Sequence, residues 1–181
     1  MAHDHHHSNS PYTQTLEELD FMRSIHNACI EGATEKVRNI IVKKGSHVVN
    51  ERDSTGYTPL HYATRNNHLE ICRILLSHDA DVNATTPELL STPLHRAILI
   101  NNQSLTSLLL LNGANCRLQD IDGQTPLHKA CEKGYTDIAV MLVKRDRSLL
   151  EIKDNKGRTP IECCASEEMK TLVFKVGSEK G

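Results

Sequence analysis

The sequence predicts an all-α solenoid of about five helix-turn-helix repeats, joined by short β-turn or hairpin connections. The main observation is the tetrapeptide Thr-Pro-Leu-His, which occurs at residues 58–61, 92–95 and 125–128 and, altered to Thr-Pro-Ile-Glu, at residues 159–162. Successive copies start 34, 33 and 34 residues apart. A period near 33 residues is typical of stacked repeats, in which each unit buries its apolar face only against its neighbours.

Composition supports one domain. About 38% of the 181 residues are apolar, which supplies a core if the repeats stack side by side. The 21 basic and 23 acidic residues are mixed, whereas a nucleic-acid-binding protein needs a basic face. No apolar run approaches the ~20 residues that cross a bilayer, and no signal peptide is recognisable. We therefore expect a monomeric, cytoplasmic or nuclear protein that binds no nucleic acid and no membrane.

The first unit, about residues 20–52, is degenerate. Residues 25–28 (Ile-His-Asn-Ala) align with residues 60–63 (Leu-His-Tyr-Ala), but the Thr-Pro pair is missing. Lys36 also occupies the position that apolar Ile71 holds in the second unit. Because the terminal units of a solenoid need a polar outer face, we interpret this unit as the N-terminal cap.

The second unit, residues 53–86, shows the whole pattern. Asp53 and Gly56 suit a tight turn, because an Asp side chain can bond its own backbone and Gly tolerates a positive φ. Thr58 is a preferred N-cap and Pro59 a preferred first helical residue. A helix is therefore predicted to begin at this pair.

Two short helices are expected in this unit. Leu60 and Ala63 lie three residues apart, on one face of the first helix, and Asn67-His68 end it. Residues 69–77 form the second helix, in which three apolar residues follow helical spacing: Ile71, Leu75 and Leu76. Helices of about 8 to 10 residues do not persist alone, so packing between repeats must stabilise them.

The remaining units repeat this pattern with changes. The third and fourth units span about residues 87–119 and 120–153, and the third turn lacks the Asp-x-x-Gly sequence of the others. The fifth unit, about residues 154–177, begins with Thr159-Pro160 but replaces the motif His by Glu162. We interpret it as the C-terminal cap.

The predicted repeat domain spans residues 16–177, between disordered tails at residues 1–15 and 178–181. The first tail contains the tract His3-Asp4-His5-His6-His7, and such tracts bind divalent metals loosely. The six cysteines lack Cys-x-x-Cys spacing, so we interpret them as small, reduced core residues. The alternative hypothesis is a metal- or redox-responsive regulator that uses the His tract and the adjacent Cys163-Cys164 pair.

The repeated pattern resembles the ankyrin repeat family over about residues 20–177. The resemblance is carried by Thr-Pro-Leu-His with an Ala two residues later in all three full copies, and by Asp79-Ala80 and Gly113-Ala114 before the next units. It implies an ankyrin-repeat solenoid that serves as a protein-protein interaction module, an adaptor or an inhibitor by occlusion. It implies an unidentified partner protein, no cofactor and no catalysis. The chain also contains no P-loop, Gly-x-Ser-x-Gly or His-Glu-x-x-His motif.

The motif histidines are not expected to form a metal or catalytic site. They recur about one repeat apart along the array, so they cannot converge on one ion. The resemblance implies that each of them ties a helix to a turn through hydrogen bonds. The four positions are His26, His61, His95 and His128.

The resemblance places the binding surface on the concave side of the array, at the turn residues before Thr-Pro and at the end of each first helix. In the second and fourth units these positions are mostly polar. In the third unit the turn reads Pro-Glu-Leu-Leu-Ser, and its helix ends in Leu99 and Ile100. We expect Leu99 and Ile100 to be exposed. Leu89 and Leu90 either join them or fold inward to offset the missing Gly.

An exposed apolar patch with a polar rim marks an interaction site. Leu99 and Ile100 are the predicted anchors, Leu89 and Leu90 are possible helpers, and polar residues form the rim. The candidate partner-binding residues are therefore Tyr57, Arg65, Leu89, Leu90, Leu99, Ile100 and Lys133.

Asn83 is a candidate for oxygen-dependent hydroxylation. The spacing of Leu75, Asp81-Val82 and Asn83 resembles that of the ankyrin proteins that asparaginyl hydroxylases accept. The alternative is that Asn83 stabilises a turn. Incubation with such a hydroxylase, followed by mass spectrometry of the peptide that contains Asn83, distinguishes the two.

Overall fold

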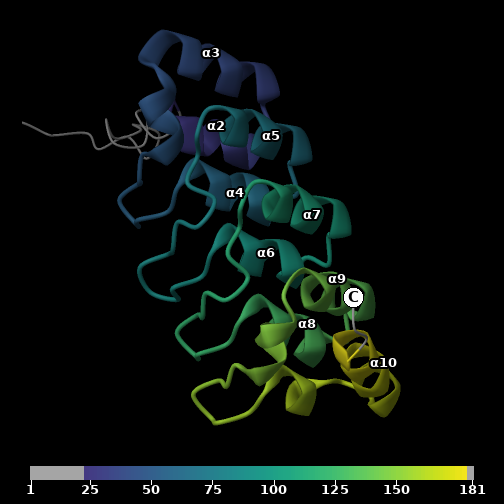
Figure 1. Ribbon diagram of the computed structural model, residues 1–181. Coiled ribbons are helices and arrows are strands. Elements are labelled where there is room, and N and C mark those ends of the chain that lie inside the picture. Colours follow the sequence, from purple (N-terminus) through teal and green to yellow (C-terminus); the bar gives the residue numbers. More distant parts are fainter. Residues whose placement is uncertain (1–22, 179–181) are drawn as a thin grey trace, which may run out of the picture.

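The computed structural model describes residues 23–178, which form a stack of helical repeats (Figure 1). This part of the chain contains nine α-helices and three 3-10 helices and no strand. The α-helices are α2 (Ile25–Glu31), α3 (Thr34–Lys44), α4 (Pro59–Arg65), α5 (Leu69–Ser77), α6 (Pro93–Leu99), α7 (Gln103–Leu111), α8 (Pro126–Lys133), α9 (Thr136–Arg145) and α10 (Glu167–Ser178). The 3-10 helices are η1 (Ser46–Asn50), η2 (Arg147–Glu151) and η3 (Pro160–Cys163).

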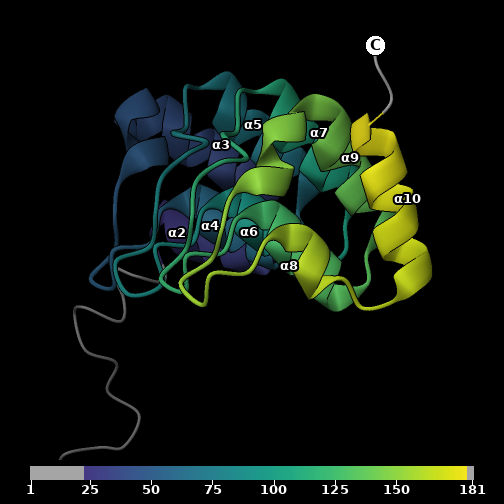
Figure 2. The ribbon, with the colours of Figure 1, turned by 60° about the horizontal axis from the view of Figure 1, so that its bottom comes forward.

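The helices form two layers. The first helices of the repeats, α2, α4, α6 and α8, pack side by side, and the second helices, α3, α5, α7 and α9, pack beside them in the same order (Figures 1 and 2). The Leu and Ala of each motif are almost completely buried: Leu60, Ala63, Leu94, Ala97, Leu127 and Ala130. Because these residues recur at the same helical positions, each repeat covers the apolar face of the next. The predicted all-α repeat solenoid is confirmed.

The central first helices begin at the Thr-Pro pairs, as predicted. Thr58, Thr92 and Thr125 are the N-caps of α4, α6 and α8, and each forms a capping box with the motif His three residues later. A Pro follows each cap at the position where its missing N–H has no helical partner to lose. The second helix of the second repeat spans Leu69–Ser77, also as predicted.

The motif histidines connect consecutive repeats. Nδ1 of His95 accepts a hydrogen bond from the backbone N–H of Thr92 (3.3 Å), which leaves Nε2 to donate to the backbone oxygen of Gln124 in the next repeat (3.1 Å). Equivalent contacts join His61 to the backbone oxygen of Ser91 and His128 to that of Arg158, whereas His26 contacts the backbone oxygen of Glu51 within the first repeat. The structural role that the resemblance implied for these side chains is confirmed.

The fifth repeat departs from the helix-turn-helix pattern. Its first helix is only the four-residue η3, and α10 begins seven residues after Pro160, whereas α9 begins ten residues after Pro126. The hydroxyl oxygen of Ser166 accepts a hydrogen bond from the backbone N–H of Met169 (3.2 Å), and acidic residues occupy the first turn of α10. This N-terminal capping starts the second helix early and leaves no room for a full first helix.

The predicted tails, including the His tract at residues 3–7, lie outside the described residues, except for Ser178 at the end of α10. Within the described chain, no helix has both the length and the apolar character needed to cross a membrane.

Candidate partner-binding surface

The turns before the Thr-Pro pairs and the ends of the first helices form one surface, which we call the turn face. The turns of consecutive repeats follow one another along one side of the stack, at the left of Figure 1. In the second repeat, Thr55 and Tyr57 of the turn, Tyr62 and Arg65 of α4, and Pro87 of the next turn line an open hollow of about 720 Å³. The turn and the end of the first helix of this repeat therefore line the same hollow.

The turn of the second repeat is organised by its first residue. The Asp53 carboxylate accepts hydrogen bonds from the backbone N–H groups of Thr55 and Tyr57, both at 2.9 Å. Gly56 closes the turn at φ 79°, in the left-handed region that Gly adopts without strain. The fourth and fifth turns have the same arrangement, with Asp120 and Gly123 and with Asp154 and Gly157.

The turn of the third repeat is built differently. The backbone N–H of Thr86 donates to the oxygen of Ser91, and the N–H of Leu90 donates to the oxygen of Thr86, both at 3.0 Å. In the second turn, the N–H of Asp53 donates to the oxygen of Tyr57, and the N–H of Gly56 donates to the oxygen of Asp53. Each hydrogen bond of the third turn spans one residue more than its counterpart there. The third turn thus contains one additional residue, which accounts for the 34-residue step between Thr58 of the second repeat and Thr92 of the third.

Leu90 takes the place that Gly holds in the neighbouring turns. Its φ is 50°, a conformation that costs an L-residue other than Gly roughly 1 to 2 kcal/mol. Leu89 and Leu90 are 43% and 41% exposed, so neither side chain folds inward to offset the missing Gly. The protein therefore keeps a strained, exposed Leu on the turn face, and strain of this kind is concentrated at functional sites.

Substitution of Leu90 by Gly is expected to raise the free energy of unfolding by about 1 kcal/mol, because it removes the left-handed strain. Leu89→Gly is the matched control: its backbone is not left-handed, so the change should lower stability by about 1 kcal/mol. Urea unfolding of both variants measures the effect. A loss of stability in Leu90→Gly would show that the side chain stabilises the turn by packing.

The end of α6 is apolar and exposed. Leu99 and Ile100 are both 38% exposed, as expected. At the equivalent positions the second repeat has Arg65-Asn66 and the fourth has Glu132-Lys133, and all four of these residues are exposed. Tyr57 is half-buried and packs on Tyr62, with ring centroids 5.6 Å apart. The candidate residues of the second to fourth repeats thus occupy equivalent turn and helix-end positions, and the aliphatic ones belong to the third repeat.

Two residues of the fourth turn modify this picture. Gln124 occupies one of the turn positions before Thr-Pro where the resemblance places the binding surface, but it is buried, and Nε2 of His95 contacts its backbone oxygen. Ile121, another of these turn positions, is exposed, and its N–H donates to the backbone oxygen of Leu89 (2.9 Å). Ile121 therefore extends the apolar patch.

Asn83 connects two repeats. Its side-chain oxygen accepts a hydrogen bond from the N–H of Asn115 (2.8 Å), and its amide nitrogen donates to the backbone oxygen of Gly113 (3.3 Å). Its own N–H donates to the Asp81 carboxylate (2.9 Å). These contacts support a turn-stabilising role, and hydroxylation of Asn83 stays a prediction.

The cysteines are free thiols, and five of the six are buried. Burial raises the pKa of Cys163 and of Cys164, so the thiolate needed for redox chemistry is a minor form at neutral pH. Between residues 23 and 178, no group of three or more His, Cys, Asp or Glu side chains is placed to hold a metal ion. The described residues thus offer no support for a metal- or redox-responsive regulator.

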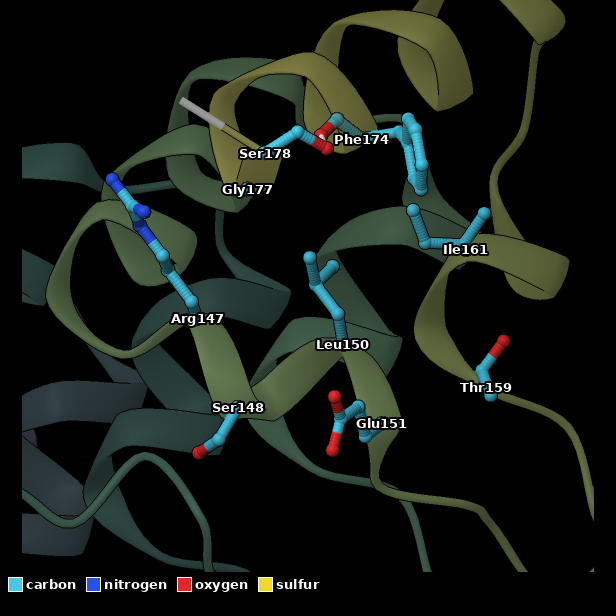
Figure 3. A pocket seen from close by; sticks show the side chains of 9 residues that line it. All are labelled: Arg147, Ser148, Leu150, Glu151, Thr159, Ile161, Phe174, Gly177 and Ser178. Atoms are coloured by element: carbon cyan, nitrogen blue, oxygen red, sulfur yellow. Dashed lines mark hydrogen bonds between the residues drawn. The ribbon is translucent and has the colours of Figure 1, made fainter. Parts of the chain in front are cut away.

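The C-terminal cap contains a cleft of about 560 Å³, lined by residues of η2, η3 and α10 (Figure 3). The side chains of Leu150, Ile161 and Phe174 approach one another across it (Figure 3). A central repeat would be covered at this position by the next repeat of the stack. We therefore interpret the cleft as the incompletely covered end of the core, and the turn face remains the candidate site.

The fold and the turn face define a helical repeat scaffold that offers an open surface for contacts. Sequence models of ankyrin repeats match residues 7–86 and 91–179, and a second such model matches residues 65–110. The chain belongs to the ankyrin repeat family, as the Thr-Pro-Leu-His motif predicted. These repeats indicate a protein-protein interaction module.

Several relatives share this sequence pattern. Ankyrin repeat domain-containing protein 39 of Homo sapiens is 44% identical over 73 residues, which are 40% of this chain and 39% of that protein. The probable 26S proteasome regulatory subunit p28 of Saccharomyces cerevisiae is 30% identical over 150 residues, which are 82% of this chain and 65% of that protein. The nuclear factor NF-kappa-B p105 subunit of Gallus gallus is 32% identical over 171 residues, which cover 82% of this chain and 17% of that protein. The chain spans less than two thirds of each of these relatives.

Proposed function

We propose that the chain is a non-catalytic binding module, an adaptor or an inhibitor by occlusion, whose partner protein docks on the turn face at the third repeat. The observation that carries the proposal is the exposure of four aliphatic side chains in the turn and at the helix end of the third repeat: Leu89, Leu90, Leu99 and Ile100. Exposed apolar patches with polar rims are typical of interaction sites. By the family resemblance, this surface would be the concave face that binds the partner.

Physical reasons favour this patch over the rest of the surface. Apolar area removed from water contributes about 25 cal/mol per Å², and a few central residues usually carry most of an interface. The third turn also keeps Leu90 in a conformation that Gly would adopt without strain. Tyr57, Arg65 and Lys133 occupy turn and helix-end positions of the adjacent repeats and would form the rim.

The relatives and the charge agree with a protein partner. Two of the relatives are named as subunits of larger assemblies. The formal net charge of −2 favours a protein over a nucleic acid as the partner. The proposal includes a monomeric chain that acts in the cytoplasm or the nucleus.

The test is the double substitution Leu99→Asp with Ile100→Asp in the full chain. Partner capture, measured by affinity purification and mass spectrometry beside the unchanged chain, is expected to be lost, because each anchor is worth roughly 2 kcal/mol or more. The melting temperature should change by only a few degrees, since both side chains are exposed.

The matched control is Val42→Asp with Leu111→Asp. These residues are 83% and 82% exposed on α3 and α7, in the layer of second helices, and lie away from the turn face. The control should retain every captured partner. Capture that survives in the Leu99 and Ile100 variant would refute the assignment of the anchors.

A further inference from the structure

Arg96 lacks the partner that its equivalents have. It follows the motif His of the third repeat, and the equivalent residues of the second and fourth repeats bond the Asp that begins their own turn. The third turn begins with Thr86, so Arg96 has no such carboxylate. The two complete pairs are Tyr62 with Asp53 at 2.5 Å and Lys129 with Asp120 at 2.8 Å.

The guanidinium of Arg96 is poorly satisfied by the described residues. Nη2 donates to the hydroxyl of Tyr57 at 3.5 Å, which is the long limit for a hydrogen bond. Nε is buried and has no acceptor in the described part of the chain. None of the ion pairs between residues 23 and 178 includes Arg96. A buried N–H without an acceptor is unfavourable in a cation, and a carboxylate matches the two terminal nitrogens of the guanidinium with two parallel bonds.

The residues around Arg96 further restrict which kind of ligand would fit. Leu99 and Ile100 lie three and four residues later, on the same face of the helix, and the N–H of Ile100 donates to the backbone oxygen of Arg96 (3.3 Å). Tyr57, which contacts Arg96, also lines the hollow of about 720 Å³ in the second repeat. Arg96, Leu99 and Ile100 do not line this hollow themselves, so a ligand that contacts them as well as the hollow must extend along the turn face.

Other charges limit how acidic that ligand is. Arg65, which lines the same hollow, also belongs to none of the ion pairs formed by residues 23–178 and adds a second cation. The exposed carboxylate of Glu88, in the third turn, also lines the hollow, and Glu132 is exposed at the end of α8. They would repel a run of acidic residues. The charges therefore favour one acidic residue among apolar ones.

We propose that the turn face binds an extended segment of the partner that places one Asp or Glu carboxylate on Arg96 and a neighbouring Leu or Ile against Leu99 and Ile100. This proposal rests on the proposed function and specifies the chemistry of the partner. The carboxylate replaces the Asp that the third turn lacks, and the hydroxyl of Tyr57 lies beside it.

The test begins with selection of dodecapeptides from a random phage-displayed library on the full chain. Selected peptides are expected to share one Asp or Glu within a few residues of Leu or Ile. Arg96→Gln, which removes the charge at similar size, should weaken binding of a selected peptide about tenfold or more. Arg38→Gln is the matched control, since Arg38 pairs with Glu70 on the layer of second helices, and its affinity should not change.

A charge-deleted peptide completes the test without depending on the variant. Replacing the acidic residue of the peptide by its amide should weaken binding to the unchanged chain by a similar factor, and should weaken binding to Arg96→Gln no further. Selection that yields no binders, or binders without an acidic residue, overturns the proposal. Binders without an acidic residue that are lost with Leu99→Asp and Ile100→Asp would overturn it while leaving the proposed function intact.

Discussion

Lowering the pH from about 7.5 to about 4.5 is expected to reduce the free energy of unfolding by about 5 kcal/mol, because two motif histidines are neutral in the folded protein. Burial lowers the pKa of His61 and of His95 to about 4 from an ordinary value of 6.5. Burial also lowers the pKa of His128. Each of these imidazoles uses one nitrogen as an acceptor, as in the contact of His95 with the Thr92 N–H, and protonation would remove that acceptor.

The direction follows from proton uptake by the unfolded chain. As the pH falls below 6.5, the unfolded histidines bind protons while the folded ones remain neutral until about pH 4. The stabilisation is therefore fully present above pH 6.5 and is lost as the pH falls toward 4. One pKa unit corresponds to 1.36 kcal/mol, so each of His61 and His95 contributes roughly 2 to 3 kcal/mol to the loss. Since domains are stable by only about 5 to 15 kcal/mol, the protein should be close to unfolding at the lower pH.

Urea unfolding at a series of pH values measures this loss. The variant His95→Gln should begin less stable at neutral pH, but its loss across the same range should be smaller by about 2 kcal/mol, because one titrating group is gone. Carboxylates such as Asp53 and Asp120 have pKa values below the ordinary 3.8. They take up protons only at lower pH, so they do not account for the loss of stability in this pH range. A stability that is constant between about pH 7 and pH 5 would contradict the prediction.

The helix starts could be predicted from the sequence because they depend on local interactions. Thr58 and Pro59 determine the first turn of α4 through a cap and a fixed φ, and the same pair recurs in the next two repeats. The fifth repeat shows where local signals compete. Thr159 and Pro160 start η3 as the motif predicts, but the cap at Ser166 starts the following helix before a full turn pattern can develop.

The apolar part of the candidate site could also be predicted, since Leu99 and Ile100 fall at the helix end that is exposed in the second, third and fourth repeats. The exposure of Leu90 could not be predicted. A Leu in the left-handed region is unfavourable, so an exposed side chain and an inward-folded one were both physically reasonable. Arg96 was missed because its lack of a carboxylate depends on the third turn. Comparison with Tyr62 and Lys129 at the same position would have been the signal.

Substitution of Gly123 by Ala is expected to destabilise the protein by about 3 kcal/mol, more than the same change at any turn without a stacked neighbour. Gly123 has φ 72°, and a Cβ there would lie 2.7 Å from the backbone nitrogen of Asn155 in the next turn. That nitrogen donates to the oxygen of Asp122 (3.0 Å), and the Asn155 side chain donates to the oxygen of Ile121 (2.9 Å). The added methyl group thus forces apart the two hydrogen bonds that join these turns, each worth about 1 kcal/mol, and adds left-handed strain of about 1 kcal/mol.

Gly157→Ala is the matched control for this effect. Its φ is 75°, almost the same as that of Gly123, but no atom lies within 4 Å of the position that a Cβ would occupy. The control should therefore show the strain alone, about 1 kcal/mol. Urea unfolding of both variants gives the difference of about 2 kcal/mol that we assign to stacking of the fourth turn on the fifth. Equal destabilisation by the two substitutions would mean that the turns contribute nothing to the coupling between these repeats, which would then depend on the helices and on His128 alone.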